Sequence, residues 1–229
     1  MSSLIRIWDL PTRLFQWLLA ASVGGALTTG WLGGNWMVWH GRLGLAIAGL
    51  LAFRLAWGLC GSTYVRFAQL RQLPRALPAY LRGEWHGAGH NPLGWLSVLA
   101  MLAALSFQVV SGLLGSDDIA FVGPLSRLVD GATSEWLTGL HRRAVWLVLA
   151  LIGLHLAALL FYRLARGENL VPAMLSGRRR VADAAARPAS GGGPLALLLA
   201  LAVAGAALWA ADGGWIAAPP PAAQSAPAW

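Results

Sequence analysis

The stretch HRRAVWLVLALIGLH, residues 141–155, places a histidine at each end of an apolar run, and the rest of the chain can be arranged around it. A helix rises about 1.5 Å and turns about 100° per residue, so His141 and His155 lie on nearly one face, about 21 Å apart. The hydrocarbon core of a bilayer is about 30 Å thick. A helix over this stretch would therefore hold one imidazole near each membrane surface.

The composition indicates an integral membrane protein. Of the 229 residues, 57% are hydrophobic and 11% are charged, which is unusual for a soluble domain. In a membrane protein, the residues behind the net charge of +8 indicate which loops face the cytoplasm. We therefore expect no nucleic-acid partner. Cys60 is the single cysteine, which excludes an internal disulfide and the covalent attachment of c-type haem. Any haem would be held non-covalently.

Five apolar runs, all long enough to span a membrane as helices, predict an all-α integral membrane fold. They cover roughly residues 14–32, 39–60, 94–114, 142–162 and 194–211. The 61–93 and 163–193 connections are rich in arginine, whereas the 115–141 loop is rich in acidic residues. The positive-inside rule therefore predicts a cytoplasmic N-terminus and a C-terminus outside. We divide the chain into a membrane domain at 1–180 with basic cytoplasmic connections, a linker at 181–193, a fifth spanning helix at 194–211 and a disordered periplasmic tail at 212–229.

The predicted topology gives depths to the histidines. The helices that begin with His40 and His141 run in the same direction, so both imidazoles lie at the outer surface and can face each other across one haem. Paired imidazoles fill both axial positions of haem iron, which suits electron transfer. The alternatives are histidines that hydrogen-bond neighbouring helices, a proton relay or another metal site.

The inner level differs from the outer one. At the depth of His155 the first helix carries Gln16, and Gly30, 14 residues further on, would leave room for a flat macrocycle at the outer level. Arg54 follows His40 by 14 residues, so it would pair with a propionate or extend to the cytoplasmic surface.

Four stretches together resemble a known family. They are IRIWDLPTRLFQWLL, HGRLGLAIAGLLAFRLAWGLCGSTYVRF, GHNPLGWLSVLAMLAAL and LHRRAVWLVLALIGLHLAALLFYRLARGENLVPAMLSGRR, and they cover nearly all of residues 4–180. The chain resembles the bacterial membrane di-haem cytochrome b family, of the cytochrome b-561 and nickel-iron hydrogenase cytochrome b subunit type. That family includes a quinone-linked superoxide oxidase, and formate dehydrogenase cytochrome subunits are more distantly similar.

The resemblance implies a four-helix bundle that holds two stacked b haems, often with a fifth transmembrane helix. His40 and His141 would be the axial ligands of the outer haem. His155 and a histidine of the first helix would bind the inner haem, but here the family's arginine-x-x-histidine-tryptophan has Gln16 after Arg13. The inner haem would then be absent, bind through His155 alone, or take His90 from the inner loop. Quinone binds near the inner haem in related proteins.

These observations predict a multi-pass b-type cytochrome of the bacterial inner membrane, either an electron-transfer protein or an oxidoreductase subunit. It would pass electrons between a periplasmic redox partner, such as a c-type cytochrome or a hydrogenase, and the quinone pool. One alternative is a haem-poor subunit that anchors or docks a periplasmic redox protein. Another is a superoxide:quinone oxidoreductase, in which Arg42, Arg142 and Arg143 attract the anion. The sequence leaves open whether the chain forms a homodimer or joins a larger complex.

Overall fold

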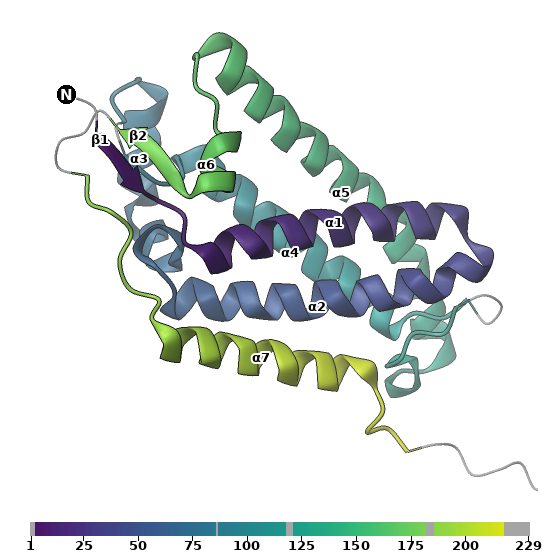
Figure 1. The fold of residues 1–229 in the computed structure, drawn as a ribbon. Coiled ribbons are helices and arrows are strands. Elements are labelled where there is room, and N and C mark those ends of the chain that lie inside the picture. Colours follow the sequence, from purple (N-terminus) through teal and green to yellow (C-terminus); the bar gives the residue numbers. More distant parts are fainter. Residues whose placement is uncertain (1–2, 86, 118–120, 182–185, 218–229) are drawn as a thin grey trace, which may run out of the picture.

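A computed structural model describes residues 3–85, 87–117, 121–181 and 186–217, and it shows a bundle of long helices (Figure 1). Two helix hairpins form its centre. The first consists of α1 (Leu10–Leu32) and α2 (Met37–Cys60), joined by the short turn η1 (Gly34–Trp36). The second consists of α4 (Pro92–Leu114) and α5 (Gly131–Ala165), with the turn η4 (Ser126–Leu128) between them. The last helix, α7 (Pro194–Asp212), packs along α2 on the side away from α1.

The ends of the long helices follow from local chemistry. Asp9, Asn91 and Asp130 precede α1, α4 and α5, and each accepts a hydrogen bond from a backbone N–H three residues further on. Such caps satisfy amide groups that have no partner inside the helix. Prolines in the first turns of α1, α4 and α7 suit positions where no intrahelical donor is needed. After α7, Gly213 takes a left-handed conformation with φ of 70°, which glycine adopts most easily.

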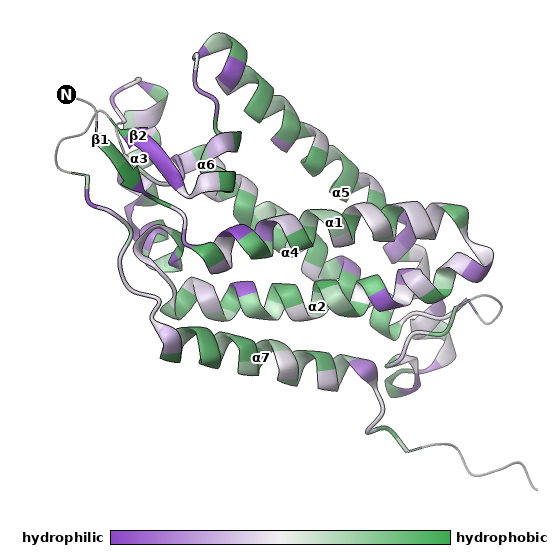
Figure 2. Ribbon diagram, in the orientation of Figure 1, coloured by the Kyte–Doolittle hydropathy of each residue, from purple (hydrophilic) through white to green (hydrophobic). Residues whose placement is uncertain are grey.

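Smaller elements gather at one end of the bundle. Strand β1 (Ser3–Arg6) pairs antiparallel with β2 (Arg178–Val181), which follows the short helix α6 (Val171–Ser176). The turns η2 (Thr63–Val65) and η3 (Phe67–Gln72) lead into α3 (Leu73–Leu81) between the two hairpins. Figure 2 shows hydrophilic residues concentrated here, whereas the long helices are mostly hydrophobic. We call this the basic end, because most arginines of the connections 61–93 and 163–193 lie in it.

Side-chain hydrogen bonds fix the basic end to the bundle. The carboxylate of Asp9 accepts from the indole N–H of Trp57 at 3.2 Å and from the Ser62 hydroxyl, which joins the start of α1 to the end of α2. The hydroxyl groups of Tyr80 in α3 and Tyr162 in α5 lie 2.5 Å apart. The position of α3 is therefore tied to the second hairpin as well as to the chain that precedes it.

Four described segments are long and apolar enough to span a membrane: Gly34–Cys60, Pro92–Leu114, Gly131–Ala165 and Pro194–Asp212. Helix α1 is less apolar, because it contains Gln16, Thr28 and Thr29, but its 23 residues pack antiparallel to α2. Helix α1 thus completes the bundle beside a helix that could span the membrane. The predicted all-α membrane fold is confirmed, with four described segments that could span a membrane and α1 packed beside them.

Two features differ from the sequence expectation. Helix α5 begins at Gly131, so the last part of the expected 115–141 loop, residues 131–141, is helical. The expected linker at 181–193 is ordered near its end, where the Ala189 N–H donates to the Arg6 carbonyl oxygen at 2.7 Å. Residues 182–185 of that linker and 218–229 of the expected tail lie outside the described residues.

Candidate functional site

His40 and His141 face each other between the two hairpins. Their ring centres are 6.0 Å apart and their ring planes are inclined by 83°. Two imidazoles that bind one metal ion from opposite sides, with metal–nitrogen distances of about 2 Å, have ring centres about 6 Å apart. The rings of His40 and His141 are therefore at a separation that suits two ligands of one haem iron. Phe121 contacts the His40 ring edge-on, with ring centres 6.2 Å apart.

Each of the two imidazoles is oriented by a carbonyl group of the neighbouring helix. His40 Nδ1 lies 2.9 Å from the carbonyl oxygen of Ala26 in α1, and His141 Nδ1 lies 2.9 Å from that of Gln108 in α4. A carbonyl oxygen accepts hydrogen bonds only, so in both residues Nδ1 carries the proton. The lone pair is then on Nε2, which is the arrangement of histidines that bind metals.

A glycine makes room for each ring. A Cβ atom on Gly30 of α1 would lie 2.9 Å from His40 Nδ1, and one on Gly112 of α4 would lie 3.0 Å from His141 Cε1. These glycines come four residues after Ala26 and Gln108, the residues whose carbonyl groups accept from the rings. The same device therefore occurs once in each hairpin. The imidazole of His40 occupies the space beside Gly30. We had expected this space to hold a flat macrocycle.

Sequence reasoning missed part of this arrangement. The structure adds Gly112, the Gln108 carbonyl group, and the hydroxyl of Ser111, which lies 3.2 Å from His141 Nδ1. The available signal was a glycine at the depth of His141 on the preceding helix, but the spacing within one helix does not show which neighbour a ring contacts.

The other predicted site residues lie towards the basic end. Helix α5 packs against α4 and diverges from α1 towards its C-terminus, so the helices that carry Gln16 and His155 separate at this level (Figure 1). Both side chains are half-buried. Arg13 does not approach the paired histidines, because its guanidinium group donates to the Leu175 carbonyl oxygen next to α6.

Arg54 and His90 form a buried polar group at the basic end. Arg54 is 4% exposed, donates to the Val65 carbonyl oxygen at 3.3 Å and lies over the ring of Phe67. The His90 ring packs between Trp8 and Trp95, with ring centres 4.6 and 5.0 Å away. Within the described residues, Arg54 Nη1 and His90 Nδ1 are buried without a hydrogen-bond partner.

The environment of His90 keeps it neutral. Burial, and then the positive charge of Arg54 and an electrostatic effect of His155, lower the pKa of His90 to about 3. At neutral pH the ring is therefore uncharged and has a free lone pair. Arg54 and His155 therefore lie close enough to His90 to affect its charge. Sequence reasoning offered His90 only as an alternative ligand from the inner loop.

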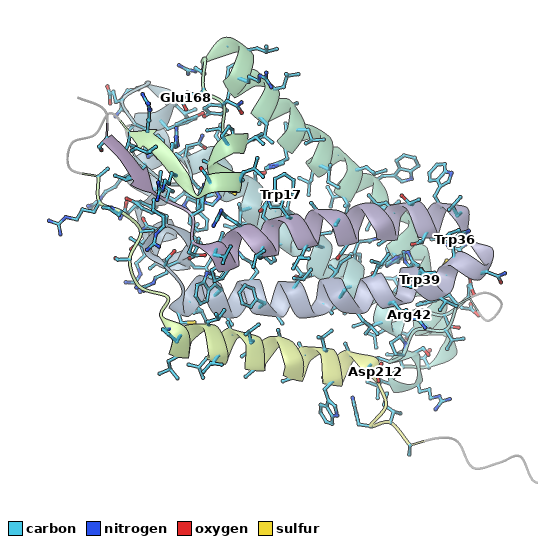
Figure 3. All side chains as sticks on the ribbon, in the orientation of Figure 1. Trp17, Trp36, Trp39, Arg42, Glu168 and Asp212 are labelled. Carbon is cyan, nitrogen blue, oxygen red and sulfur yellow. The ribbon has the colours of Figure 1, made fainter. Side chains whose placement is uncertain are left out.

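The surface near the paired histidines carries arginines whose charge is partly compensated. Arg142 lies 3.4 Å from the carboxylate of Asp117, and Arg42 stacks over the ring of Trp39 at 4.9 Å. Figure 3 shows Trp36, Trp39 and Arg42 together at this end of α2, opposite the basic end.

A membrane-spanning bundle that holds two carbonyl-bound imidazoles between helix hairpins has the architecture of a membrane cytochrome b. The chain belongs to the prokaryotic cytochrome b561 family, whose model matches residues 7–177, from the approach to α1 to the end of α6. No curated protein and no solved structure matches the chain. This match confirms the resemblance that the sequence analysis identified. The chain is a membrane b-type cytochrome that takes part in electron transfer, and its family binds b-type haem.

Proposed function

We propose that this cytochrome passes electrons between a periplasmic redox protein and the quinone pool, through a haem whose iron is bound by His40 and His141. The observation that carries the proposal is the facing pair of imidazoles, with ring centres 6.0 Å apart and each Nδ1 held by a helix carbonyl. Haem iron supplies a one-electron change of oxidation state.

The protein's contribution is to hold two nitrogen donors in place. A haem iron held by His40 and His141 would have no position left for a substrate, so the site would be suited to electron transfer. The bonds from Nδ1 to the carbonyl groups of Ala26 and Gln108 fix the ring orientations and raise the basicity of Nε2. Gly30 and Gly112 allow the rings to lie directly against the neighbouring helices.

The distribution of charge supports an orientation in the bacterial inner membrane. The basic end contains the arginine-rich connections, which the positive-inside rule assigns to the cytoplasm. The N-terminal strand lies at this end, and α7 ends at the opposite one, where Gly213 approaches the Pro124 carbonyl oxygen. The N-terminus would be cytoplasmic, the C-terminus periplasmic, and the His40–His141 pair would lie near the periplasmic surface. A c-type cytochrome or a hydrogenase is the kind of partner that could exchange electrons there.

Spectroscopy and quinone reactivity test this function together. Purified protein, expressed with ample haem, is expected to show a low-spin b haem that dithionite reduces and a short-chain quinone then reoxidises. We would measure reduced-minus-oxidised absorbance spectra and the rate of reoxidation after rapid mixing. Protein that contains no haem would contradict the proposed site. Protein with a low-spin haem that no quinone oxidises would contradict the quinone step alone.

The inner level determines how electrons would reach the cytoplasmic half of the membrane. Gln16 offers only a weak oxygen ligand, and the helices that carry Gln16 and His155 diverge at this level. We propose one outer haem in the native chain, with His155 and the neighbouring Arg54 and His90 remaining as the polar part of an inner site. Quinone could approach in the space where related proteins hold the inner haem.

Gln16→His is expected to raise the haem content from one per chain to two, because it supplies the missing imidazole opposite His155. The measurement is the ratio of haem, as its pyridine complex, to protein. Gln16→Leu serves as the control, since it changes the same position without adding a ligand. An unchanged ratio in Gln16→His would mean that the divergence of α1 and α5, and not only the ligand, prevents haem binding.

The second candidate function is a docking subunit that holds a periplasmic redox protein without conducting electrons across the bilayer. Gln16 favours it, because one haem near one surface leaves a long gap to the other side. The two functions differ in the quinone experiment, which a docking subunit would fail while it still retains a periplasmic cytochrome during purification.

A further inference from the structure

A hollow at the basic end lies apart from the paired histidines His40 and His141. It has a volume of about 360 Å³ and is lined by Arg71, Gln72, Arg75, Ala76 and Trp85. A second cavity of about 310 Å³ adjoins it, because Gln72, Ala76 and Trp85 line both. The second cavity continues inward to the loop before α4. We call the first cavity the α3 hollow, since η3 and α3 supply most of its wall.

The α3 hollow carries positive charge that no carboxylate of the described residues neutralises. Arg71 at the end of η3 and Arg75 in the first turn of α3 are four residues apart and both line the hollow. Among the described residues, neither arginine has a carboxylate within ion-pair distance. Glu84, the acidic residue nearest in sequence, pairs with Arg82 at 2.9 Å. The two guanidinium groups are thus available for an anion.

The α3 hollow lies at the depth of lipid headgroups. The chain enters it from α2, which ends at Cys60, and leaves it for α4, which begins at Pro92, and both helices span the membrane. Trp85 lines the hollow, and tryptophan is enriched at the membrane–water interface. The hydrogen bond between Tyr80 and Tyr162 holds α3 against the bundle, so the hollow is a fixed feature of the fold.

We propose that the α3 hollow binds the headgroup of an anionic phospholipid. Guanidinium groups bind phosphate oxygens through paired hydrogen bonds, and two of them on successive turns suit one phosphodiester. One water molecule occupies about 30 Å³ in the liquid, so the two cavities offer far more room than a bare phosphate needs. The adjoining cavity accommodates the hydroxyl-bearing remainder of the headgroup, where Gln69 and Gln72 line the wall. The adjoining cavity is also lined by His90, so the lipid site borders the inner level, but it shares no residue with the His40–His141 site.

Native mass spectrometry of the haem-loaded full chain would test the proposal. The protein would be equilibrated with equal amounts of phosphatidylglycerol and phosphatidylcholine in detergent, and retained lipid counted per chain. The native chain is expected to retain at least fivefold more phosphatidylglycerol. Arg71→Gln combined with Arg75→Gln is expected to remove that preference. The control is Arg178→Gln with Arg180→Gln, which removes two exposed arginines from β2 at the same end of the bundle.

Three results would overturn the proposal. Equal retention of the two lipids by the native chain would show that no anionic headgroup is selected, whatever the variants do. Equal loss of phosphatidylglycerol in both double variants would show that the preference comes from the overall positive charge of the basic end and not from the α3 hollow. Complete displacement of the lipid by inorganic phosphate at millimolar concentration would show a phosphate site and not a lipid site. An unchanged haem spectrum in the variants serves as the check that they fold.

Discussion

His141→Ala is expected to lower the low-spin b haem content of the purified protein more than tenfold. The substitution removes one of the two facing imidazoles and leaves His40, its Nδ1 still held by Ala26, without a partner across the site. One axial bond does not replace two, and a haem bound through one imidazole would be high-spin. The measurement is the reduced-minus-oxidised absorbance spectrum together with the haem-to-protein ratio.

His155→Ala is the matched control for this result, because it removes a histidine from the same helix at the other end of the apolar run. It is expected to leave the low-spin outer haem in place. A His141→Ala protein that keeps the native spectrum, or a His155→Ala protein that loses it, would show that the outer haem is bound by other residues.

Gly30→Ala is expected to weaken haem binding by roughly five- to 150-fold. The added Cβ would lie 2.9 Å from His40 Nδ1, so the ring must move away from the carbonyl group that orients it. An extra methyl group in a packed interior costs about 1–3 kcal/mol, which corresponds to that range of affinity. Titration of the haem-free protein with haem gives the dissociation constant.

Gly24→Ala supplies the control within the same helix. No atom lies within 4 Å of a Cβ built on Gly24, so the substitution adds a methyl group without a contact. Both variants gain about 1 kcal/mol of helix propensity from alanine. The difference between them therefore isolates the contact with His40. Equal dissociation constants for the two variants would contradict the role of Gly30.

Much of the fold could be predicted because hydropathy determines where a helix crosses a membrane. The apolar runs at 39–60, 94–114 and 194–211 correspond closely to α2, α4 and α7. The start of α5 could not be found in this way. Its first residues, from Gly131, are too polar for the bilayer, and the helix begins where Asp130 caps it outside the apolar run. The pairing of β1 with β2 joins residues more than 170 positions apart, which no local pattern reveals.

The sequence predicted the depth of the candidate site in the membrane, but not which residues contact the two histidines. The spacing of His40 and His141 from their helix ends indicated that both lie at the outer level, and the structure places their rings 6.0 Å apart. Their binding of haem iron stays a prediction. The carbonyl groups and Gly112 could not be assigned, because the rotation of each helix about its axis depends on packing between hairpins. Gln16 was informative as a departure from the family pattern, and its consequence for the inner haem stays a prediction as well.

The repeated pairing of a carbonyl group and a glycine has a consequence for how the cytochrome assembles. Each hairpin contains a complete half of the outer site, so each half is prepared as soon as two consecutive helices have inserted and paired. The contact between α2 and α4 is less extensive than the contacts inside the hairpins. Haem bound by both hairpins would then hold the two preformed halves together. Its binding free energy would stabilise the interface between the hairpins, where the protein's own contacts are less extensive. In a cell short of haem, the newly inserted chain would form both hairpins, but the hairpins would not be held in one arrangement. Quality-control proteases would then degrade it more readily.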